Sequence, residues 1–309
     1  LNNYYDLALK NKRNQMLGEH KNYKFEKIDL EDYKSVCKIY KGFKPSFVIH
    51  LAAQAGVRYS IENPKEYFDS NLRGSFNLLE ILRKEGCDHF LFASTSSIYG
   101  GNEKIPYKET DRSDFPLSFY AATKKSCEIM SHSYSHLYNI PTTCFRFFTV
   151  YGPWGRPDMA IFKFTKAILD SEPIEIYNKG DLLRDFTYVD DLIKAIIKLI
   201  EKPPAYENKG EFSKSPVAPW RTINIGSSKP IKLMDFVAAL EKASGKKAKK
   251  KYIEHQAGDV KKTYADTYAL RNLTDDQSFT SLDVGIKAFV DWYKSCLLYT
   301  SPSPRDATL

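Results

Sequence analysis

The chain has 309 residues, of which 42% are apolar, 14% aromatic and 27% charged, and its net charge is +8. This composition is typical of a globular protein and excludes a largely disordered chain, a collagen-like repeat and a disulfide scaffold. No apolar run approaches the roughly 20 residues that span a bilayer, so no membrane segment is expected. The cysteines are widely spaced and form no Cys-x-x-Cys pair, which predicts reduced thiols and a cytoplasmic protein.

Strands and helices are predicted to alternate along the first half of the chain. The predicted strands are 24–28, 45–51, 89–94 and 142–148, and the predicted helices are 31–40, 64–84 and 119–138. The strand at 45–51 (PSFVIHL) is expected to be buried. This order favours a doubly wound parallel α/β sheet. Beyond Gly152 the strands shorten, and 203–219 is predicted to be a polar surface loop.

The segment Tyr120-Ala-Ala-Thr-Lys124 carries the strongest indication of chemistry. A tyrosine and a lysine four residues apart lie on one face of a helix. A free tyrosine, with a pKa of about 10, is a poor base, but a nearby ammonium lowers that pKa. Thr95 directly follows a predicted strand, where its hydroxyl could hold a substrate alcohol beside the base. Because this spacing is common, an ordinary surface pair remains the alternative.

This segment is one of seven motifs that occur in a fixed order along the chain. They are LAAQAG (51–56), NLRGS (71–75), ASTSSIYG (93–100), YAATK (120–124), FFTVYGPWGRPDMA (147–160), GDLLRDFTYVDD (180–191) and AGDVKKTYAD (257–266). Together they resemble the extended short-chain dehydrogenase/reductase family over about residues 1–295. The pattern is most similar to the nucleotide-sugar branch whose members epimerise UDP-glucuronate at C4.

This resemblance implies a fold and a division of the chain. Residues 1–152 would form an NAD-binding Rossmann domain, and residues 296–309 a non-native tail. Residues 153–295 would form a smaller α/β lobe that binds the nucleotide sugar and is interleaved with the Rossmann domain. The chain begins without methionine and contains no glycine-rich turn for a dinucleotide pyrophosphate. We therefore expect the first βαβ unit of the family to be missing and this chain to bind NAD poorly.

The resemblance also implies roles for individual residues. The implied catalytic residues are Thr95, Tyr120 and Lys124. The implied NAD contacts are Asp29, Leu30, Leu51, Ala52, Ala53, Gln54, Asn71, Ser94, Tyr120 and Lys124. The implied substrate contacts are Arg58, Ser96, Ser97, Thr149, Arg156, Arg184 and Asp259. Arg184 alternatively forms a structural ion pair with Asp185 or Asp190, and Arg58 is alternatively a plain surface residue.

The residues after Thr95 discriminate between reactions. Related 4,6-dehydratases carry an Asp-Glu pair there, and UDP-glucuronate decarboxylases usually carry a glutamate, whereas this chain has Ser96 and Ser97. A serine hydroxyl cannot replace a carboxylate as general acid or base near neutral pH, and it does not repel a substrate carboxylate. UDP-galactose 4-epimerases usually carry Asn at the position of Thr149. These differences favour NAD-dependent 4-epimerisation of UDP-glucuronate to UDP-galacturonate.

Other functions and partners remain open at this stage. A UDP-N-acetylhexosamine or UDP-galactose 4-epimerase, or a UDP-glucuronate decarboxylase, would use most of the same residues. A nucleic-acid-binding or NAD-sensing regulator would suit the basic charge, but the lysines concentrate at 246–251, away from the motifs, so no nucleic-acid partner is expected. His132 and His136 have no third ligand, so no metal is expected. Members of the family pair as homodimers, through helices that here would start near Pro64 and Phe119.

Overall fold

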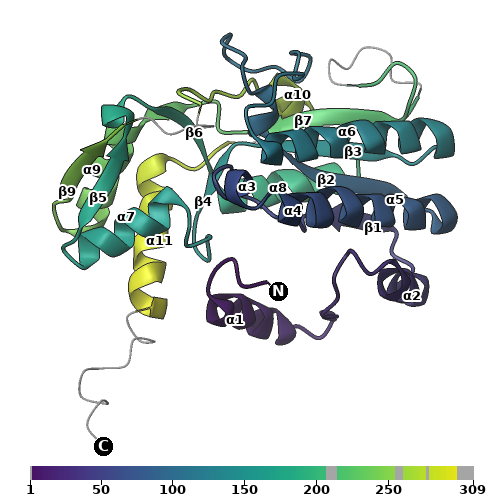
Figure 1. The fold of residues 1–309 in the computed structure, drawn as a ribbon, viewed down its shortest axis with the longest axis horizontal. Coiled ribbons are helices and arrows are strands. Elements are labelled where there is room, and N and C mark those ends of the chain that lie inside the picture. The colour runs from purple at the N-terminus through teal and green to yellow at the C-terminus, as the bar shows by residue number, and fades with distance from the viewer. Residues whose placement is uncertain (1, 207–213, 255–259, 276–277, 298–309) are drawn as a thin grey trace, which may run out of the picture.

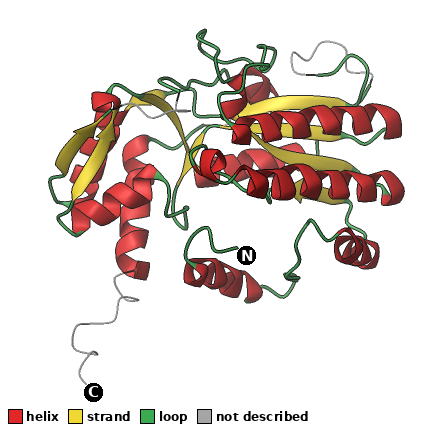
Figure 2. Ribbon diagram, viewed as in Figure 1, coloured by secondary structure: helices red, strands yellow, loops and turns green. Residues whose placement is uncertain are grey.

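The structure is a computed structural model, and it describes residues 2–206, 214–254, 260–275 and 278–297. A larger body built on a parallel sheet lies beside a smaller lobe of short strands and helices (Figures 1 and 2). Within the described residues, no helix is long and apolar enough to cross a membrane.

The larger body is organised around four parallel strands in the order β1-β2-β3-β7. They are β1 (Phe47–His50), β2 (His89–Thr95), β3 (Thr142–Phe147) and β7 (Trp220–Ile225). Phe90 and Phe92 of β2 pack into the core on one face of the sheet, and Leu91 packs into the core on the other. This alternation buries both faces, as in other parallel sheets with helices on each side. The predicted parallel α/β sheet is confirmed.

Helices cover both faces of this sheet (Figure 1). One face carries α2 (Tyr33–Phe43), α5 (Gly74–Glu85) and α6 (Phe119–Tyr138), and the other carries α8 (Val189–Ile200) and α10 (Tyr268–Leu273). The helix predicted at 119–138 has the bounds of α6. Ser118 starts it by accepting a hydrogen bond from the Ala121 amide at 3.2 Å.

The helix predicted over 64–84 is confirmed, but it is not uniform. It consists of α4 (Pro64–Tyr67), a π-helical turn (Phe68–Arg73) and α5, and the short helix α3 (Tyr59–Glu62) precedes it. The π turn contains the buried Asn71. Such turns are frequent at functional sites because they redirect one side chain without ending the helix.

The smaller lobe has its own apolar core. Its elements are α7 (Ala160–Leu169), β5 (Pro173–Tyr177), α9 (Leu233–Ser244), β9 (Lys249–Ile253) and α11 (Leu282–Leu297). In Figure 1, β4 (Thr149–Tyr151) and β6 (Leu183–Tyr188) lie between the lobe and the larger body. Together with β8 (Pro230–Lys232) they form a three-stranded sheet. The rings of Phe186 and Phe236 stack in the lobe core at 4.4 Å between centroids.

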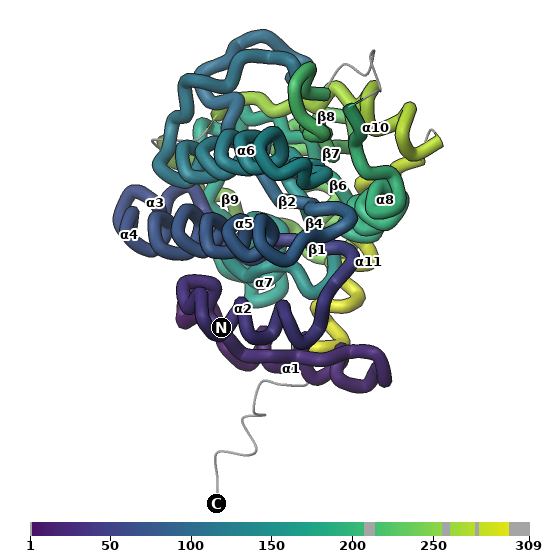
Figure 3. The backbone as a smooth tube through the Cα atoms, turned by 90° about the vertical axis from the view of Figure 1, so that its right-hand side faces the viewer, coloured from purple at the N-terminus to yellow at the C-terminus, as the bar shows by residue number. Residues whose placement is uncertain are grey.

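Two predictions near the N-terminus are wrong. Residues 24–28 form no strand, because no described strand lies beside them to complete a ladder. The strand predicted to be buried is the edge strand β1, so Phe47 and Ile49 remain 44% and 40% exposed. Helix α1 (Leu7–Gly18) lies below the sheet in Figure 3, and its Arg13 donates a hydrogen bond to the Gly155 carbonyl at 2.9 Å.

Candidate functional site

The carboxyl end of β2 presents the first group of site residues. The Thr95 hydroxyl accepts a hydrogen bond from the Ser97 amide and donates one to the Ser97 hydroxyl, both at 3.2 Å. This cap starts a 3₁₀ turn over Ser96–Tyr99, in which both serines are partly exposed. Ligands of open α/β sheets bind where the carboxyl ends of the strands meet. The structure therefore places three hydroxyls at the edge where a ligand is expected.

Helix α6 brings Tyr120 to the same edge. The Tyr120 phenol lies beside the Thr95 hydroxyl, and its ring packs edge-on against Tyr67, 6.0 Å between centroids. Burial raises the pKa of Tyr120, whereas the hydrogen bond with Thr95 and the positive charge of Arg156 lower it, and the net shift is upward. The predicted base and the predicted hydroxyl are thus neighbours.

Lys124 lies one helical turn beyond Tyr120 and is only 3% exposed. Its ammonium lies over the Phe92 ring, 4.5 Å from the centroid, and burial lowers its pKa to about 8. The predicted lowering of the Tyr120 pKa is wrong for this structure, because burial of the phenol outweighs the groups that favour the phenolate. The ammonium remains mostly protonated at neutral pH.

Asn71 fixes the loop that follows β1. Its side-chain oxygen accepts a hydrogen bond from the Gln54 amide at 2.8 Å, and its side-chain nitrogen donates to the Gln54 carbonyl at 3.0 Å. The same nitrogen donates to the Thr123 hydroxyl of α6 at 3.0 Å. The π turn that buries Asn71 thereby ties the predicted cofactor loop to the helix that carries Tyr120.

The residues around this loop fit a dinucleotide. Leu51 is 51% exposed although it is apolar, and Ala52 beside it is also exposed, so an apolar surface is available at the strand end. The side-chain amide of Gln54 and the ammonium of Lys124 are groups that ribose hydroxyls and a carboxamide can bond. This combination of an apolar surface with amide and ammonium donors is consistent with NAD at the carboxyl edge.

The remaining predicted cofactor residues lie on β2, in the loop after β1 and beside α5. The Leu30 carbonyl accepts a hydrogen bond from the Asn77 side chain of α5 at 2.9 Å, and Asp29 next to it is exposed. Ala53 is partly exposed in the loop after β1, and Ser94 is buried next to Thr95 on β2.

Arg156 and Asp158 form a charged pair near Tyr120. The Arg156 Nε donates to the Asp158 carboxylate at 3.0 Å, and its Nη2 donates to the second carboxylate oxygen. The Tyr4 hydroxyl donates to the same carboxylate at 3.0 Å. The side chains of Arg156 and Asp158 are 31% and 25% exposed, so a ligand can still reach the guanidinium.

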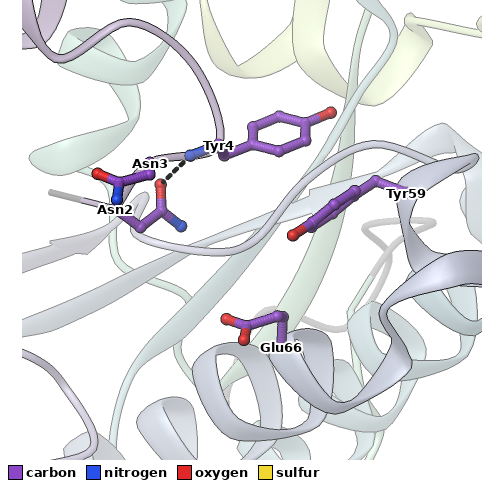
Figure 4. A pocket seen from close by; sticks show the side chains of 5 residues that line it. All are labelled: Asn2, Asn3, Tyr4, Tyr59 and Glu66. Carbon is purple, nitrogen blue, oxygen red and sulfur yellow. Dashed lines mark hydrogen bonds between the residues drawn. The ribbon is translucent and has the colours of Figure 1, made fainter.

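A pocket of about 450 Å³ is lined in part by Tyr4, whose hydroxyl bonds Asp158. In Figure 4 the N-terminal segment faces Tyr59 and Glu66 across it, and the residues that line it are Asn2, Asn3, Tyr4, Tyr59 and Glu66. The Asn2 side chain donates to the Gln54 side chain at 2.8 Å. The N-terminal segment that lines it therefore contacts the predicted cofactor loop through Asn2 and Asp158 through Tyr4.

The other predicted substrate residues are more widely spread. The Arg58 guanidinium lies over the Tyr177 ring of β5 at 4.2 Å, so it connects the larger body with the lobe. Thr149 begins β4 and is partly exposed. The Arg184 Nη1 on β6 donates to the Lys261 carbonyl at 3.0 Å. Asp259 lies outside the described residues.

Sequence reasoning missed two residues of this site. Asp158 could have been found, since it follows Arg156 by two positions in the same motif. Tyr4 could not, because nothing in the sequence indicates that an N-terminal segment returns to a loop more than 150 positions later.

Known proteins resemble this chain over most of its length. Residues 2–213 match the family described as "NAD dependent epimerase/dehydratase family". The chain is 50% identical over 295 residues to the probable UDP-glucuronate 4-epimerase of Rhizobium meliloti (strain 1021), which covers 94% of this chain and 86% of that protein. It is 49% identical over 298 residues to Protein CapI of Staphylococcus aureus, with coverages of 95% and 89%.

A solved structure shares the fold. UDP-glucuronic acid 4-epimerase from Bacillus cereus, in complex with UDP-glucuronic acid and NAD, superposes with a TM-score of 0.82 at 32% identity. The match covers 93% of this chain and 87% of that one. The similarity therefore includes both the sheet and the smaller lobe.

Proposed function

The chain belongs to the NAD dependent epimerase/dehydratase family, and we propose that this UDP-sugar 4-epimerase interconverts UDP-glucuronate and UDP-galacturonate. The choice of sugar rests on the charges around the proposed base. The uncharged Ser96 and Ser97 follow Thr95 at the strand edge, and Arg156 is close enough to Tyr120 to lower its pKa. Hydroxyls and a guanidinium suit a sugar carboxylate, and the absence of carboxylates after Thr95 argues against water elimination.

Tyr120 is the base of the proposed reaction. Its phenolate takes the proton of the sugar 4-hydroxyl, and the Thr95 hydroxyl beside it holds the substrate oxygen in place. Lys124, with a pKa of about 8, is mostly charged at neutral pH and lies one helical turn from Tyr120. The positive charge of Arg156 is the group that favours the phenolate. On the return step, the neutral phenol gives the proton back to the oxygen at C4.

NAD supplies the redox chemistry when it is bound, because it accepts the hydride of C4 and returns it to the opposite face of the sugar. Its proposed contacts are Asp29, Leu30, Leu51, Ala52, Ala53, Gln54, Asn71, Ser94, Tyr120 and Lys124. The hydrogen bonds between Asn71 and Gln54 support this assignment, since they hold the loop in one conformation without ligand.

A uronate substrate adds a requirement at C5. The 4-keto form of the sugar is a β-keto acid, which loses carbon dioxide readily, so the site must hold the carboxylate in an unreactive orientation. Ser96, Ser97 and Thr149 supply hydroxyls for this task, and Arg156 supplies the charge. The Asp158 carboxylate keeps the Arg156 guanidinium in one orientation before substrate arrives.

The diphosphate and the nucleoside are assigned to the side of the lobe. Arg184, whose guanidinium presents a fork of donors, is the proposed diphosphate ligand. The Arg58 guanidinium stacks on Tyr177 and thereby links the larger body to the lobe. A change in the distance between the two would alter this contact.

The proposed functional unit is a cytoplasmic homodimer. Three apolar side chains are exposed on neighbouring helical segments. They are Phe68 of the π turn (52% exposed), Phe76 of α5 (45%) and Ile129 of α6 (60%). The Tyr134 hydroxyl of α6 donates to Glu80 of α5 at 2.6 Å, so the two helices present one surface. A second copy of this surface would bury these side chains. Sedimentation velocity of a Phe76→Lys variant tests the proposal, and an unchanged dimer would contradict it.

Replacement of Tyr120 by phenylalanine tests the base. Turnover of UDP-glucuronate at saturating NAD should fall by about 10²–10⁴-fold, while calorimetric binding of UDP-glucuronate stays within a few-fold. Tyr138→Phe, at the far end of the same helix, is the matched control and should behave as the wild type. Near-normal epimerisation by the Tyr120 variant would remove Tyr120 from the mechanism.

A further inference from the structure

A buried polar network lies directly beneath the candidate site. At its centre, Arg146 of β3 forms a two-pronged ion pair with Glu128 of α6, with Nε–Oε1 and Nη2–Oε2 distances of 3.0 and 2.9 Å. Their side chains are 3% and 1% exposed. Glu128 lies two helical turns beyond Tyr120, so the pair attaches the face of α6 that bears the base to the sheet.

Tyr99 connects this network to the strand edge. Its hydroxyl accepts a hydrogen bond from the Arg146 Nη1 at 3.0 Å and donates one to the Asn224 side-chain oxygen on β7 at 2.6 Å. Asn224 is itself fixed, because its amide donates to the Glu109 carboxylate and its side chain donates to the Tyr107 carbonyl, both at 2.8 Å. The phenol is fully buried and has both a donor and an acceptor in place.

Tyr99 is also the last residue of the turn that carries the two serines. Thr95 anchors the start of that turn at the end of β2, and Tyr99 anchors its end through the network. Gly100 follows with a φ of +48°, and a side chain there would meet the Phe115 carbonyl at 2.1 Å, so the chain must leave the turn along one path. Ser96 and Ser97 are therefore held between two fixed points.

We propose that Tyr99 is a positioning residue that sets the fate of the 4-keto intermediate by fixing Ser96 and Ser97 against the substrate carboxylate. This inference rests on the proposed function. In the side reaction, the C5–C6 bond breaks, its electron pair moves into an enolate with the C4 carbonyl, and carbon dioxide leaves. A proton from water then adds at C5, which gives a UDP-4-keto-pentose.

The balance between the two fates depends on geometry. The C5–C6 electron pair reaches the carbonyl only when that bond stands roughly perpendicular to the carbonyl plane. When the Ser96 and Ser97 hydroxyls are fixed, they keep the substrate carboxylate near the plane of the C4 carbonyl. When the turn that carries them moves, the carboxylate can rotate into the reactive, perpendicular orientation. Loss of the Tyr99 hydroxyl removes the two side-chain hydrogen bonds, to Arg146 and Asn224, that hold the last residue of the turn, without changing any group that contacts the reacting atoms.

A Tyr99→Phe variant tests this proposal. With UDP-glucuronate labelled in the carboxyl carbon and saturating NAD, the ratio of released carbon dioxide to UDP-galacturonate should rise about tenfold or more above that of the wild type. The pH profile of turnover should be unchanged, because Tyr120 is intact. Tyr107→Phe is the matched control: its ring stacks on Tyr99 at 4.6 Å, but its hydroxyl donates only to backbone carbonyls among the described residues.

The outcomes separate this inference from the proposed function. An unchanged ratio in Tyr99→Phe, or an equal rise in Tyr107→Phe, overturns the role of Tyr99. Failure of the wild type to make UDP-galacturonate overturns the proposed function instead, and the inference with it. If Tyr99→Phe does not fold, Asn224→Ser removes the acceptor of the same hydroxyl and should raise the ratio in the same direction; an unchanged ratio in that variant also overturns the role.

Discussion

Lys124 is expected to be a functional residue that weakens the fold. Its pKa is lowered from the ordinary 10.5 to about 8 by burial, and its side chain is 3% exposed. Each unit of this shift corresponds to about 1.4 kcal/mol, so the protonated form destabilises the folded protein by about 3 kcal/mol at neutral pH. Lys124→Met, which keeps the length of the side chain and removes its charge, should stabilise the protein by about this amount and abolish turnover.

The effect of Lys124 on the free energy of unfolding depends on pH in a defined direction. The folded pKa lies below the unfolded value, so between about pH 8 and 10.5 the unfolded chain binds the extra proton and the folded chain does not. The free energy of unfolding of the wild type should therefore rise through that interval. The advantage of Lys124→Met is complete below pH 8 and disappears as the pH approaches 10.5.

Urea unfolding of the NAD-free proteins, followed by circular dichroism at neutral pH and at about pH 10, measures both effects. Lys125→Met is the matched control, because Lys125 is the next residue, is 22% exposed and lies 3.7 Å from the Glu128 carboxylate. That variant should gain no stability. A Lys124→Met variant that is less stable than the wild type at neutral pH, or an advantage that does not change with pH, would refute the reasoning.

Three further variants probe the site and its support. Ser97→Asp places a negative charge beside the proposed position of the substrate carboxylate and should raise the KM for UDP-glucuronate about tenfold, or about 1.4 kcal/mol; an unchanged KM would count against that position. Asp158→Asn loosens Arg156 and should weaken calorimetric binding of UDP-glucuronate more than that of UDP, whereas equal losses would assign Arg156 elsewhere. Asp185→Ala removes a buried acceptor of four hydrogen bonds, so the free energy of unfolding should fall by about 2–4 kcal/mol; a urea midpoint equal to that of the wild type would show that these bonds are dispensable.

The sheet and its central helices follow from local sequence patterns. The strands at β2 and β3 are short apolar runs that are buried on both faces, and α6 has a serine cap and a helical period, so their positions could be predicted within a residue. The segment at 24–28 (KFEKI) has only two apolar residues, Phe25 and Ile28, and a strand also needs a partner, which a sequence pattern does not reveal.

The site was predictable only in part, for physical reasons. The spacing of Tyr120 and Lys124 fixes their common helix face, and the strand end fixes Thr95 beside the base. The pKa of Tyr120 was not predictable from this spacing, because it depends on burial and on a distant arginine. Glu128 continues the helical spacing and could have been found, whereas its partner Arg146 meets it only through the packing of α6 on β3.

The product formed from UDP-glucuronate tests the central claim most directly. Incubation of the wild-type protein with UDP-glucuronate and saturating NAD, followed by NMR of the sugar nucleotides, should show UDP-galacturonate appearing until the two uronates reach equilibrium. No net change in the amount of oxidised or reduced cofactor should accompany it. A UDP-pentose as the main product, or epimerisation of UDP-glucose with no reaction of UDP-glucuronate, would contradict the account.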